Sequence, residues 1–327
     1  MTYIGNPVAS YRELQVKGDF VSVKVGVIGV GYLGQHHARI YSEIEDAELI
    51  ALIDIDEEKA KVLAAKYNCK AYSDYKDIIN ELDAVSIVTP TILHHKIALD
   101  CIKAGKDLLI EKPITVSVAE ADELINEAEK KKCILQVGHV ERYNPAVIAV
   151  SGLIKNPRFL ESERVSPFTG RSTDIDITLD LMIHDIDIML GFAASPVKEI
   201  RARGASVLTD KIDVAKVWLE FENGCAAIAT ASRLSPEKQR RLKIFQEDSF
   251  IHIDYQNHEV RVYSKKGDSL SSDIIRPEKK EPLKEELIDF IGCVKERRNP
   301  MVSGIEGRNA LKVALDITEK IRKDLGK

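Results

Sequence analysis

Charged side chains stand inside an unusually apolar stretch of this sequence. The segment from Leu181 to Leu190 is LMIHDIDIML, and Asp180 stands immediately before it. A buried helix normally excludes an unpaired carboxylate, because taking that charge out of water costs several kcal/mol or forces its protonation. These acids therefore either lie on a wet face of a helix or are held inside for chemistry.

Asp180 and His184 have the spacing of a helical pair. Residues four positions apart share one face of a helix, about one turn from each other. We expect the carboxylate to orient the imidazole and raise its proton affinity, so that His184 can exchange a proton near neutral pH. A core histidine satisfied by a local acid is the alternative. Asp185 and Asp187 are expected on other faces, toward solvent or a neighbouring helix.

A glycine-rich turn near the start of the chain is typical of a nucleotide site. Residues 29–34 are GVGYLG, which follows a β-branched run and opens a segment with helical spacing. In that context the glycines permit a tight turn, a close approach of backbone N–H groups to a pyrophosphate, and close packing of helix on strand. The predicted cofactor-binding residues of this turn are Gly29, Gly31, Tyr32, Leu33 and Gly34.

Asp54 indicates which dinucleotide binds. It stands about twenty residues after the glycine turn, at the end of the next apolar run. A carboxylate there accepts hydrogen bonds from the adenosine ribose and repels a 2′-phosphate, so NAD is favoured over NADP. Capping of the following helix is a compatible structural role for Asp54.

Short apolar runs alternate with amphipathic segments over residues 23–140. This alternation predicts an α/β domain of the Rossmann type, a doubly wound parallel sheet covered by helices on both faces. Ligands lie at the carboxyl ends of such strands. The further cofactor-binding residues predicted at that edge are Thr89, Pro90, Thr91, His94, Glu111 and Lys112.

The segment GHVERYNP, residues 138–145, marks the crossing into a second domain. Polar residues crowd this junction, a usual location for pockets. A capped helix start at Asn144 and Pro145 is the alternative. The predicted substrate-binding residues are Lys112, Arg142, Tyr143, Asn144, Arg171 and His184, with Arg142 and Arg171 as contacts for a substrate diphosphate. A solvated loop arginine is the alternative for Arg171.

Residues 141–304 are expected to form an α+β domain with an open, mainly antiparallel sheet, including a hairpin that turns at Glu222–Gly224. Residues 265–282 are expected to be a mobile polar excursion. Helices are expected at about 281–298 and 305–324, and residues 305–327 to pack back on the first domain. Residues 1–22 form an N-terminal extension. One exposed face of the sheet predicts pairing with a second copy, in a homodimer or homotetramer.

Taken together, these motifs resemble the Gfo/Idh/MocA oxidoreductases, the glucose-fructose oxidoreductase and inositol dehydrogenase family. The resemblance rests on GxGxxG, TPT, EKP at residues 111–113, and the Asp-x-x-x-His helix, and it covers nearly all of the chain. It implies NAD-dependent oxidation of a CH–OH group, with Lys112, Asp180 and His184 as catalytic residues. It leaves open whether Lys112 or His184 accepts the proton.

The segment GHVERYNP resembles the corresponding motif of a subgroup of that family that oxidises UDP-N-acetylglucosamine at its 3-hydroxyl. The resemblance therefore implies a nucleotide-sugar substrate and a 3-keto product. An inositol, glucose or other polyol dehydrogenase is the alternative, and a non-catalytic nucleotide-sensing regulator is another.

The composition excludes several other classes. A net charge of -5 argues against a nucleic-acid binder. No apolar run reaches the roughly 18–20 residues that span a bilayer, and the first twenty residues lack the order of a signal peptide. Five scattered cysteines without a CxxC pair indicate reduced thiols and a cytoplasmic protein. Neighbouring histidines diverge by about 100° on a helix, so no metal site is expected.

Overall fold

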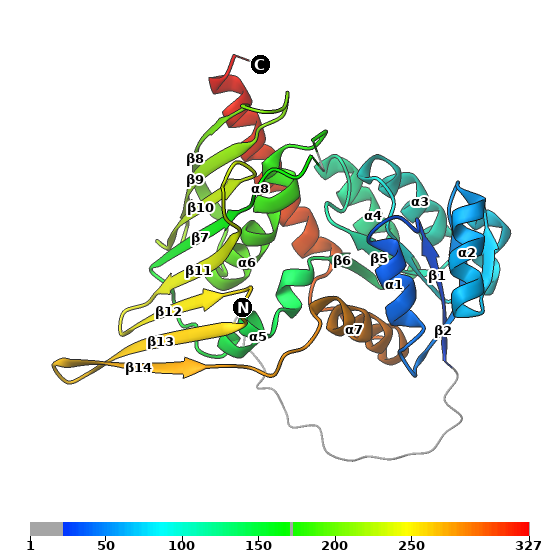
Figure 1. The fold of residues 1–327 in the computed structure, drawn as a ribbon, viewed down its shortest axis with the longest axis horizontal. Helices are drawn as coiled ribbons and strands as arrows, with labels where there is room; N and C mark the ends of the chain where they lie inside the picture. The colour runs from blue at the N-terminus through cyan, green and yellow to red at the C-terminus, as the bar shows by residue number, and fades with distance from the viewer. Residues whose placement is uncertain (1–21, 171–172, 327) are drawn as a thin grey trace.

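The computed structural model describes residues 22–170 and 173–326 and contains two domains (Figure 1). Residues 1–21 of the expected extension, and Arg171, lie outside the described residues. The first domain holds a six-stranded parallel sheet in the order β3-β2-β1-β4-β5-β6. Its strands are β1 (Val23–Ile28), β2 (Ala47–Ile53), β3 (Lys70–Tyr72), β4 (Ala84–Ile87), β5 (Asp107–Glu111) and β6 (Leu135–Gly138).

Helices connect these parallel strands, as the predicted alternation requires. They are α1 (Gly34–Tyr41), α2 (Glu57–Tyr67), α3 (Thr91–Lys103) and α4 (Val118–Lys131), with short 3-10 turns at Tyr75–Asp77 and Ile79–Glu81. Every residue of β4, β5 and β6 is buried, because helices cover both faces of the sheet. The predicted Rossmann fold is confirmed.

Local sequence explains where these helices begin and end. The Asp56 carboxylate accepts a hydrogen bond from the Lys59 N–H and caps α2, and Ser117 caps α4 in the same way through the Glu120 N–H. α2 ends at Asn68, whose left-handed backbone (φ 53°) stops the helical hydrogen-bond pattern.

The second domain is built on an eight-stranded sheet in the order β14-β13-β12-β11-β7-β10-β9-β8. Of its strand pairs only β7 and β10 run parallel, so the sheet is mainly antiparallel, as predicted. Its strands are β7 (Phe159–Val165), β8 (Val197–Ala205), β9 (Val214–Phe221), β10 (Ala226–Ser232), β11 (Gln239–Phe245), β12 (Ser249–Asp254), β13 (Glu259–Lys266) and β14 (Ser269–Ile275).

Two details of this sheet bear on the sequence predictions. The hairpin of β9 and β10 turns where expected, with Gly224 at φ 85°. The expected polar excursion over residues 265–282 is wrong in part, because residues 269–275 pair with β13 as strand β14. Backbone hydrogen bonds to a neighbouring strand outweigh the polar composition of this segment.

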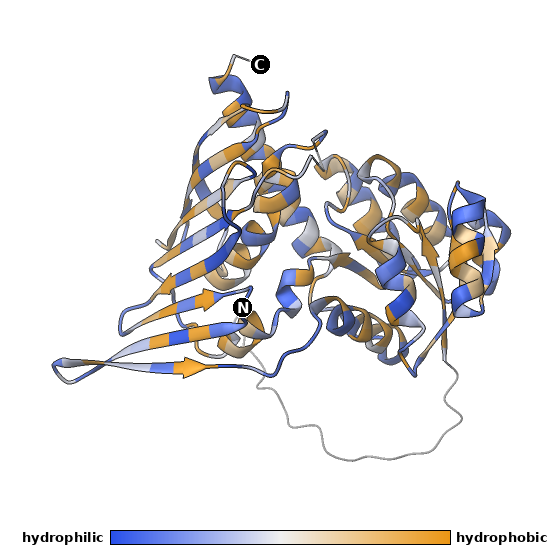
Figure 2. Cartoon of the chain, viewed as in Figure 1, coloured by the Kyte–Doolittle hydropathy of each residue, from blue (hydrophilic) through white to orange (hydrophobic). Residues whose placement is uncertain are grey.

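Helices cover one face of the second sheet and fill the space between it and the first domain (Figure 1). They are α5 (Pro145–Ser151), α6 (Ile183–Ala193) and α8 (Gly304–Asp324), and a π-helical turn at Thr178–Met182 leads into α6. In Figure 2 the apolar residues of these elements, drawn in orange, lie mainly on the sides that face the interior of the domain. A 3-10 turn, Val140–Tyr143, joins the two domains after β6.

The C-terminal helices link the two domains. α7 (Pro282–Glu296) falls in the segment expected for the second domain, but its Leu287, Phe290 and Ile291 pack in a core with β1 and α1 of the first. α8 contacts α6 and β8 of the second domain and α4 and β6 of the first. None of the described helices is long and apolar enough to cross a bilayer.

Candidate active site

The glycine turn between β1 and α1 has the shape that a dinucleotide requires. Gly29 has φ 92°, where a Cβ would lie 2.5 Å from the Val88 carbonyl oxygen, and a Cβ on Gly34 would lie 1.9 Å from the Gly29 oxygen. A Cβ on Gly31 would meet nothing within 4 Å. The backbone therefore closes tightly at Gly29 and Gly34 and stays open at Gly31, where a phosphate needs room. Tyr32, next to Gly31 in this turn, is 70% exposed, and Leu33 is partly exposed.

Asp54 lies where the prediction placed it, at the end of β2. Its Oδ2 accepts a hydrogen bond of 2.8 Å from the Val30 N–H, which ties it to the glycine turn. Its Oδ1 accepts one of 3.0 Å from the Asp56 N–H. Each carboxylate oxygen has a second lone pair that can accept a ribose hydroxyl. A cavity of about 440 Å³ borders Asp54, Gly29, Gly31, Thr89 and Pro90.

His94 connects two of the predicted cofactor loops. Its ring lies between the carbonyl oxygens of Thr89 (2.8 Å from Nε2) and Pro113 (2.9 Å from Nδ1). The residue is only 1% exposed, so the expected approach of His94 to a nicotinamide ribose is not what this structure shows. Glu111 is also buried, accepting from the Lys112 N–H (3.2 Å) and facing His37 (3.2 Å). Both residues position the loop that carries Lys112.

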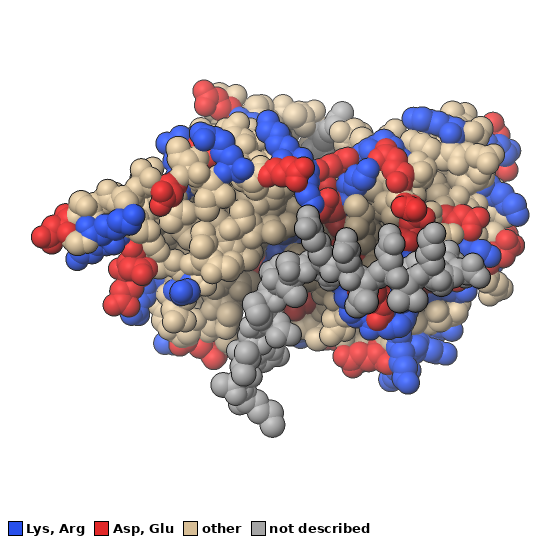
Figure 3. Space-filling model, turned by 90° about the horizontal axis from the view of Figure 1, so that it is seen from below, with Lys and Arg blue, Asp and Glu red and all other residues tan. Residues whose placement is uncertain are grey.

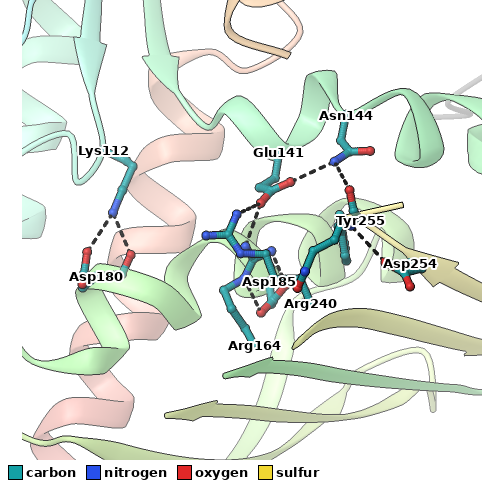
Figure 4. A network of polar contacts seen from close by, with 10 residues as sticks. Lys112, Glu141, Asn144, Arg164, Asp180, Asp185, Arg240, Asp254 and Tyr255 are labelled. Atoms are coloured by element: carbon teal, nitrogen blue, oxygen red, sulfur yellow. Dashed lines mark hydrogen bonds and ion pairs between the residues drawn. The ribbon is translucent and has the colours of Figure 1, made fainter. Parts of the chain in front are cut away.

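Lys112 and Asp180 come together from the two domains (Figure 4). The Lys112 ammonium, just after β5, donates to the Asp180 carbonyl oxygen at 2.7 Å and lies 3.5 Å from the Asp180 carboxylate. The two side chains are 17% and 25% exposed, so the pair is partly desolvated and still reachable. Charged side chains of both signs gather along the junction of the domains (Figure 3).

His184 lies close to this pair but is not oriented by Asp180. Its Nδ1 is buried and has no hydrogen-bond partner among the described residues. Burial, with the positive charges of Lys112 and Arg164, holds the pKa of the imidazole well below its usual range. The expected rise in proton affinity is therefore wrong, because the Asp180 carboxylate is directed to Lys112. This lowered pKa favours the neutral form of the imidazole.

His139 packs against His184. The two rings are edge-to-face with centroids 6.2 Å apart. Burial lowers the pKa of His139, which is 1% exposed and has no hydrogen bond at either ring nitrogen within the described chain. Its Nδ1 is 4.0 Å from the Asp187 carboxylate.

The other two acids of α6, Asp185 and Asp187, are held inside the protein and do not lie on a wet face of the helix. Asp185 and Asp187 are each 2% exposed, so of the two expected surroundings, solvent and a neighbouring helix, solvent is wrong. Asp185 accepts two hydrogen bonds of 2.9 Å from the Arg164 guanidinium, one at each carboxylate oxygen. Asp187 accepts 2.6 and 3.1 Å bonds from Arg142. Paired arginines make these buried carboxylates tolerable.

The residues of GHVERYNP have structural partners. The Arg142 guanidinium donates to Asp187 through Nε and Nη2, so these bonds direct it toward α6. The Tyr143 hydroxyl donates to Asp289 at 2.7 Å, and Tyr143 is 2% exposed. Asn144 accepts from the Ala146 N–H at 3.0 Å and caps α5, which is the alternative weighed for this segment. These three residues hold the domain junction together.

Arg164 and Arg240, which the sequence did not single out, complete the wall of the site together with Glu141 and Asp185 (Figure 4). Glu141 accepts from Arg164 at 2.7 Å and from Arg240 at 3.2 Å through one oxygen, and Arg164 also binds Asp185. Although burial raises it, the pKa of Glu141 stays below its usual range because of the Arg164 charge. An arginine on the core-facing side of a strand was the only sequence signal for Arg164.

These features fit a dinucleotide in the first domain. The glycine turn is open at Gly31, the Asp54 carboxylate borders a cavity, and Lys112 stands at the carboxyl end of the sheet. Within the described residues, no group of three or more His, Cys, Asp and Glu side chains is arranged to hold a metal ion.

Comparison with known proteins gives matches in both domains. Residues 23–139 match the family model described as "Oxidoreductase family, NAD-binding Rossmann fold", and residues 148–252 match the "GFO/IDH/MocA C-terminal domain". The first match confirms the prediction of an NAD-binding domain.

Relatives match over nearly the whole chain. UDP-N-acetylglucosamine 3-dehydrogenase of Acidithiobacillus ferrooxidans is 36% identical over 305 residues, which cover 91% of this chain and 96% of that protein. Myo-inositol 2-dehydrogenase of Thermotoga maritima is 30% identical over 88% of this chain and 93% of its own.

Solved structures share the two-domain architecture. That of the Acidithiobacillus ferrooxidans enzyme has a TM-score of 0.90 and covers 93% of this chain and 99% of its own. Levoglucosan dehydrogenase in complex with NADH has a TM-score of 0.84 over 93% of this chain and 98% of its own. At 19% identity the second likeness shows the fold alone.

Proposed function

The chain belongs to the Gfo/Idh/MocA oxidoreductase family, and from this premise we propose that it oxidises the 3-hydroxyl of UDP-N-acetylglucosamine with NAD as cofactor. The observation that carries the catalytic part is the meeting of Lys112 and Asp180 across the domain junction, 2.7 Å apart at the backbone oxygen and 3.5 Å at the carboxylate. A neutral imidazole, His184, lies beside this pair.

The three side chains divide the chemistry between them. Bound NAD supplies the acceptor for the hydride that leaves the alcohol carbon. The Lys112 ammonium donates a hydrogen bond to the reacting oxygen and stabilises negative charge as it develops there. Asp180 positions Lys112 and keeps its ammonium paired when no substrate is present.

His184 is the group we propose as proton acceptor. A base must be unprotonated before the reaction, and burial together with the Lys112 charge keeps this imidazole neutral. The Lys112 ammonium is already held by two oxygens of Asp180 and serves better as a hydrogen-bond donor. The proton therefore passes from the substrate hydroxyl to His184.

The choice of substrate rests on the relative from Acidithiobacillus ferrooxidans, which aligns over 91% of this chain. The match to a myo-inositol 2-dehydrogenase, 30% identical over 88% of the chain, supports inositol as a second candidate. Both substrates present a secondary hydroxyl on a six-membered ring, so the same three side chains serve either one.

A substrate panel tests this function. The full-length protein with NAD is assayed by nicotinamide absorbance against UDP-N-acetylglucosamine, free N-acetylglucosamine, glucose and myo-inositol. We expect reduction of NAD with the nucleotide sugar, and a product lighter by two hydrogens with a ketone at C3. Lys112→Met, which removes the ammonium and keeps the length of the stem, is the control and should lower kcat by about a hundredfold or more.

The outcomes separate the alternatives. Turnover of myo-inositol without turnover of the nucleotide sugar would establish the second candidate. Binding of NAD without turnover of any member of the panel would contradict a dehydrogenase of this substrate range and favour a sensing protein.

We further propose that two or four copies associate through the uncovered face of the second sheet. Half-exposed aromatic rings follow one another across this face, from Trp218 to Phe159, Phe245, Phe250 and Tyr263, with neighbouring centroids 4.8–5.8 Å apart. A continuous apolar row of this kind is typical of an interface. Light scattering on the purified protein would measure the mass of the particle. The five free cysteines favour the cytoplasm as its location.

A further inference from the structure

Two cations at the start of β11 are not used by the proposed chemistry. Arg240 is the second residue of β11, and Lys238 lies immediately before the strand. Leu242 and Ile244 continue the face of the strand that carries Arg240 and are buried against the helices. Arg240 therefore points toward the interior side of the sheet, where the first domain lies, and not toward the uncovered aromatic face.

Arg240 has an arginine as its direct neighbour on the next strand. In the pairing of β11 with β7 its partner is Arg164. Like charges placed opposite each other repel, and Glu141 bridges them through one oxygen, 2.7 Å from Arg164 and 3.2 Å from Arg240. Asp185 takes the other side of the Arg164 guanidinium.

The local charges do not balance. Arg164, Arg240 and Lys238 carry three positive charges, and Glu141 and Asp185 carry two negative charges. Lys238 forms no salt bridge in the described part of the chain. The Arg240 side chain is 35% exposed and donates a single hydrogen bond to a described residue, from Nη1 to Glu141. A guanidinium has five N–H donors, so most of those of Arg240 are available to a ligand.

This excess charge lies next to the reacting groups. The positive charge of Arg240 is close enough to contribute to the lowered pKa of His184, and the Asp180 carboxylate acts on Arg240 in turn. The charge of Arg240, followed by burial, lowers the pKa of Lys238, so those two cations are also neighbours. In Figure 4 the guanidinium groups of Arg164 and Arg240 converge on the Glu141 carboxylate.

We propose that Arg240 and Lys238 form the binding site for the diphosphate of a nucleotide-sugar substrate, an inference that rests on the proposed function. The planar guanidinium can hold two phosphate oxygens at once, and the ammonium adds a second point of attraction. The phosphate on C1 is only a few bonds from C3 of the same sugar, so the anion and the reacting hydroxyl must bind close together. The sequence suggested Arg142 and Arg171 for this role, and the site proposed here uses Arg240 and Lys238 instead.

The same site would discriminate between substrates. Inositols and free hexoses carry no anion, and so leave the two cations without a partner. An enzyme with this site favours nucleotide sugars over neutral polyols because only the former compensate the excess charge.

The test uses glutamine substitutions, which remove the charge and keep a hydrogen-bonding group. In Arg240→Gln the new amide can still donate to Glu141, and Lys238→Gln disturbs no ion pair. Arg241→Gln is the matched control, because Arg241 is exposed, adjacent in sequence and on the opposite face of the same strand. All three variants lose one positive charge.

Two experiments are made on the NAD-loaded enzyme: steady-state kinetics gives the KM and kcat for UDP-N-acetylglucosamine, and calorimetry gives the Kd of UDP. We expect each of Arg240→Gln and Lys238→Gln to raise the KM and the Kd, by about ten- to a hundredfold for Arg240, with kcat changed less than about threefold. Arg241→Gln should behave like the unmodified protein. If Arg240→Gln does not fold, as judged by circular dichroism, Lys238→Gln alone decides the question.

The outcomes separate this inference from the proposed function. Unchanged KM and UDP affinity in both variants overturn the diphosphate site and leave the function intact. If the unmodified enzyme binds UDP but does not oxidise the nucleotide sugar, loss of UDP binding in the variants supports the site, and the choice of substrate fails. Absence of UDP binding to the unmodified enzyme overturns the site.

Discussion

Replacing Asp185 with asparagine should destabilise the second domain strongly. The carboxylate accepts two hydrogen bonds of 2.9 Å from Arg164, and the two residues are 2% and 1% exposed. In the variant an amide group faces the guanidinium, and Arg164 remains buried with Glu141 as its single anionic partner. Breaking one side of a buried ion pair costs about 3–5 kcal/mol, because the remaining charge stays out of water without compensation.

Urea unfolding followed by tryptophan fluorescence measures this cost in the right domain. Trp218 is the only tryptophan of the chain and lies on β9 of the second sheet. With a denaturant dependence of about 2–3 kcal/mol per molar, the expected loss of stability lowers the urea midpoint by roughly 1–2.5 M.

The matched control is Glu161→Gln on the same sheet. Glu161 lies 3.2 Å from Lys243 in an ion pair whose side chains are about 40% exposed. Such exposed pairs contribute about 0–1 kcal/mol, so this variant should unfold close to the unmodified protein. If Asp185→Asn shifts the midpoint no more than Glu161→Gln, the reasoning about buried charge in this site is wrong.

Three further predictions concern the cofactor turn and the buried histidines. Asp54→Asn keeps an acceptor for the Val30 N–H but removes the charge, so kcat/KM for NAD should fall about tenfold and the preference over NADP should shrink in a comparison of both cofactors. Gly34→Ala places a Cβ 1.9 Å from a backbone oxygen and should lower the melting temperature by several degrees, whereas Gly31→Ala meets nothing within 4 Å and should weaken NAD binding in calorimetry without loss of stability. Burial depresses the pKa of His139, so as the pH falls the unfolded chain takes up a proton before the folded chain does. The contribution of His139 to stability should therefore be full above about pH 6.5 and fall below it, by up to about 1.4 kcal/mol per pH unit. His139→Gln should flatten this slope in urea titrations at several pH values.

The first domain could be predicted almost completely from the sequence because its determinants are local. The glycine turn, the apolar runs and Asp54 all lie within β1, α1 and β2, and each has a meaning that depends on neighbouring residues. The Gfo/Idh/MocA resemblance added Lys112, Asp180 and His184, and the structure brings them together. Short-range patterns sufficed wherever the partner of a residue was close in the chain.

The predictions that failed concern partners far apart in the sequence. Asp187 was expected to face solvent or a neighbouring helix, but it pairs with Arg142, which lies 45 positions earlier on the turn between the domains. α7 follows the second sheet in the chain, yet it packs on the first domain, because its apolar face completes the core beside β1. No periodicity within a segment reveals which distant surface will cover it.

The amino-acid sequence by itself determined the order of the elements, the dinucleotide turn and the types of side chain available for chemistry, because these follow from backbone preferences and hydrophobic spacing. Tertiary structure decided which charges neutralise one another. It directed Asp180 to Lys112 and not to His184, and it left Arg240 with donors to spare. The reason is physical: the energy of a charge depends on burial and on its nearest opposite charge, and both are set only when distant segments pack together.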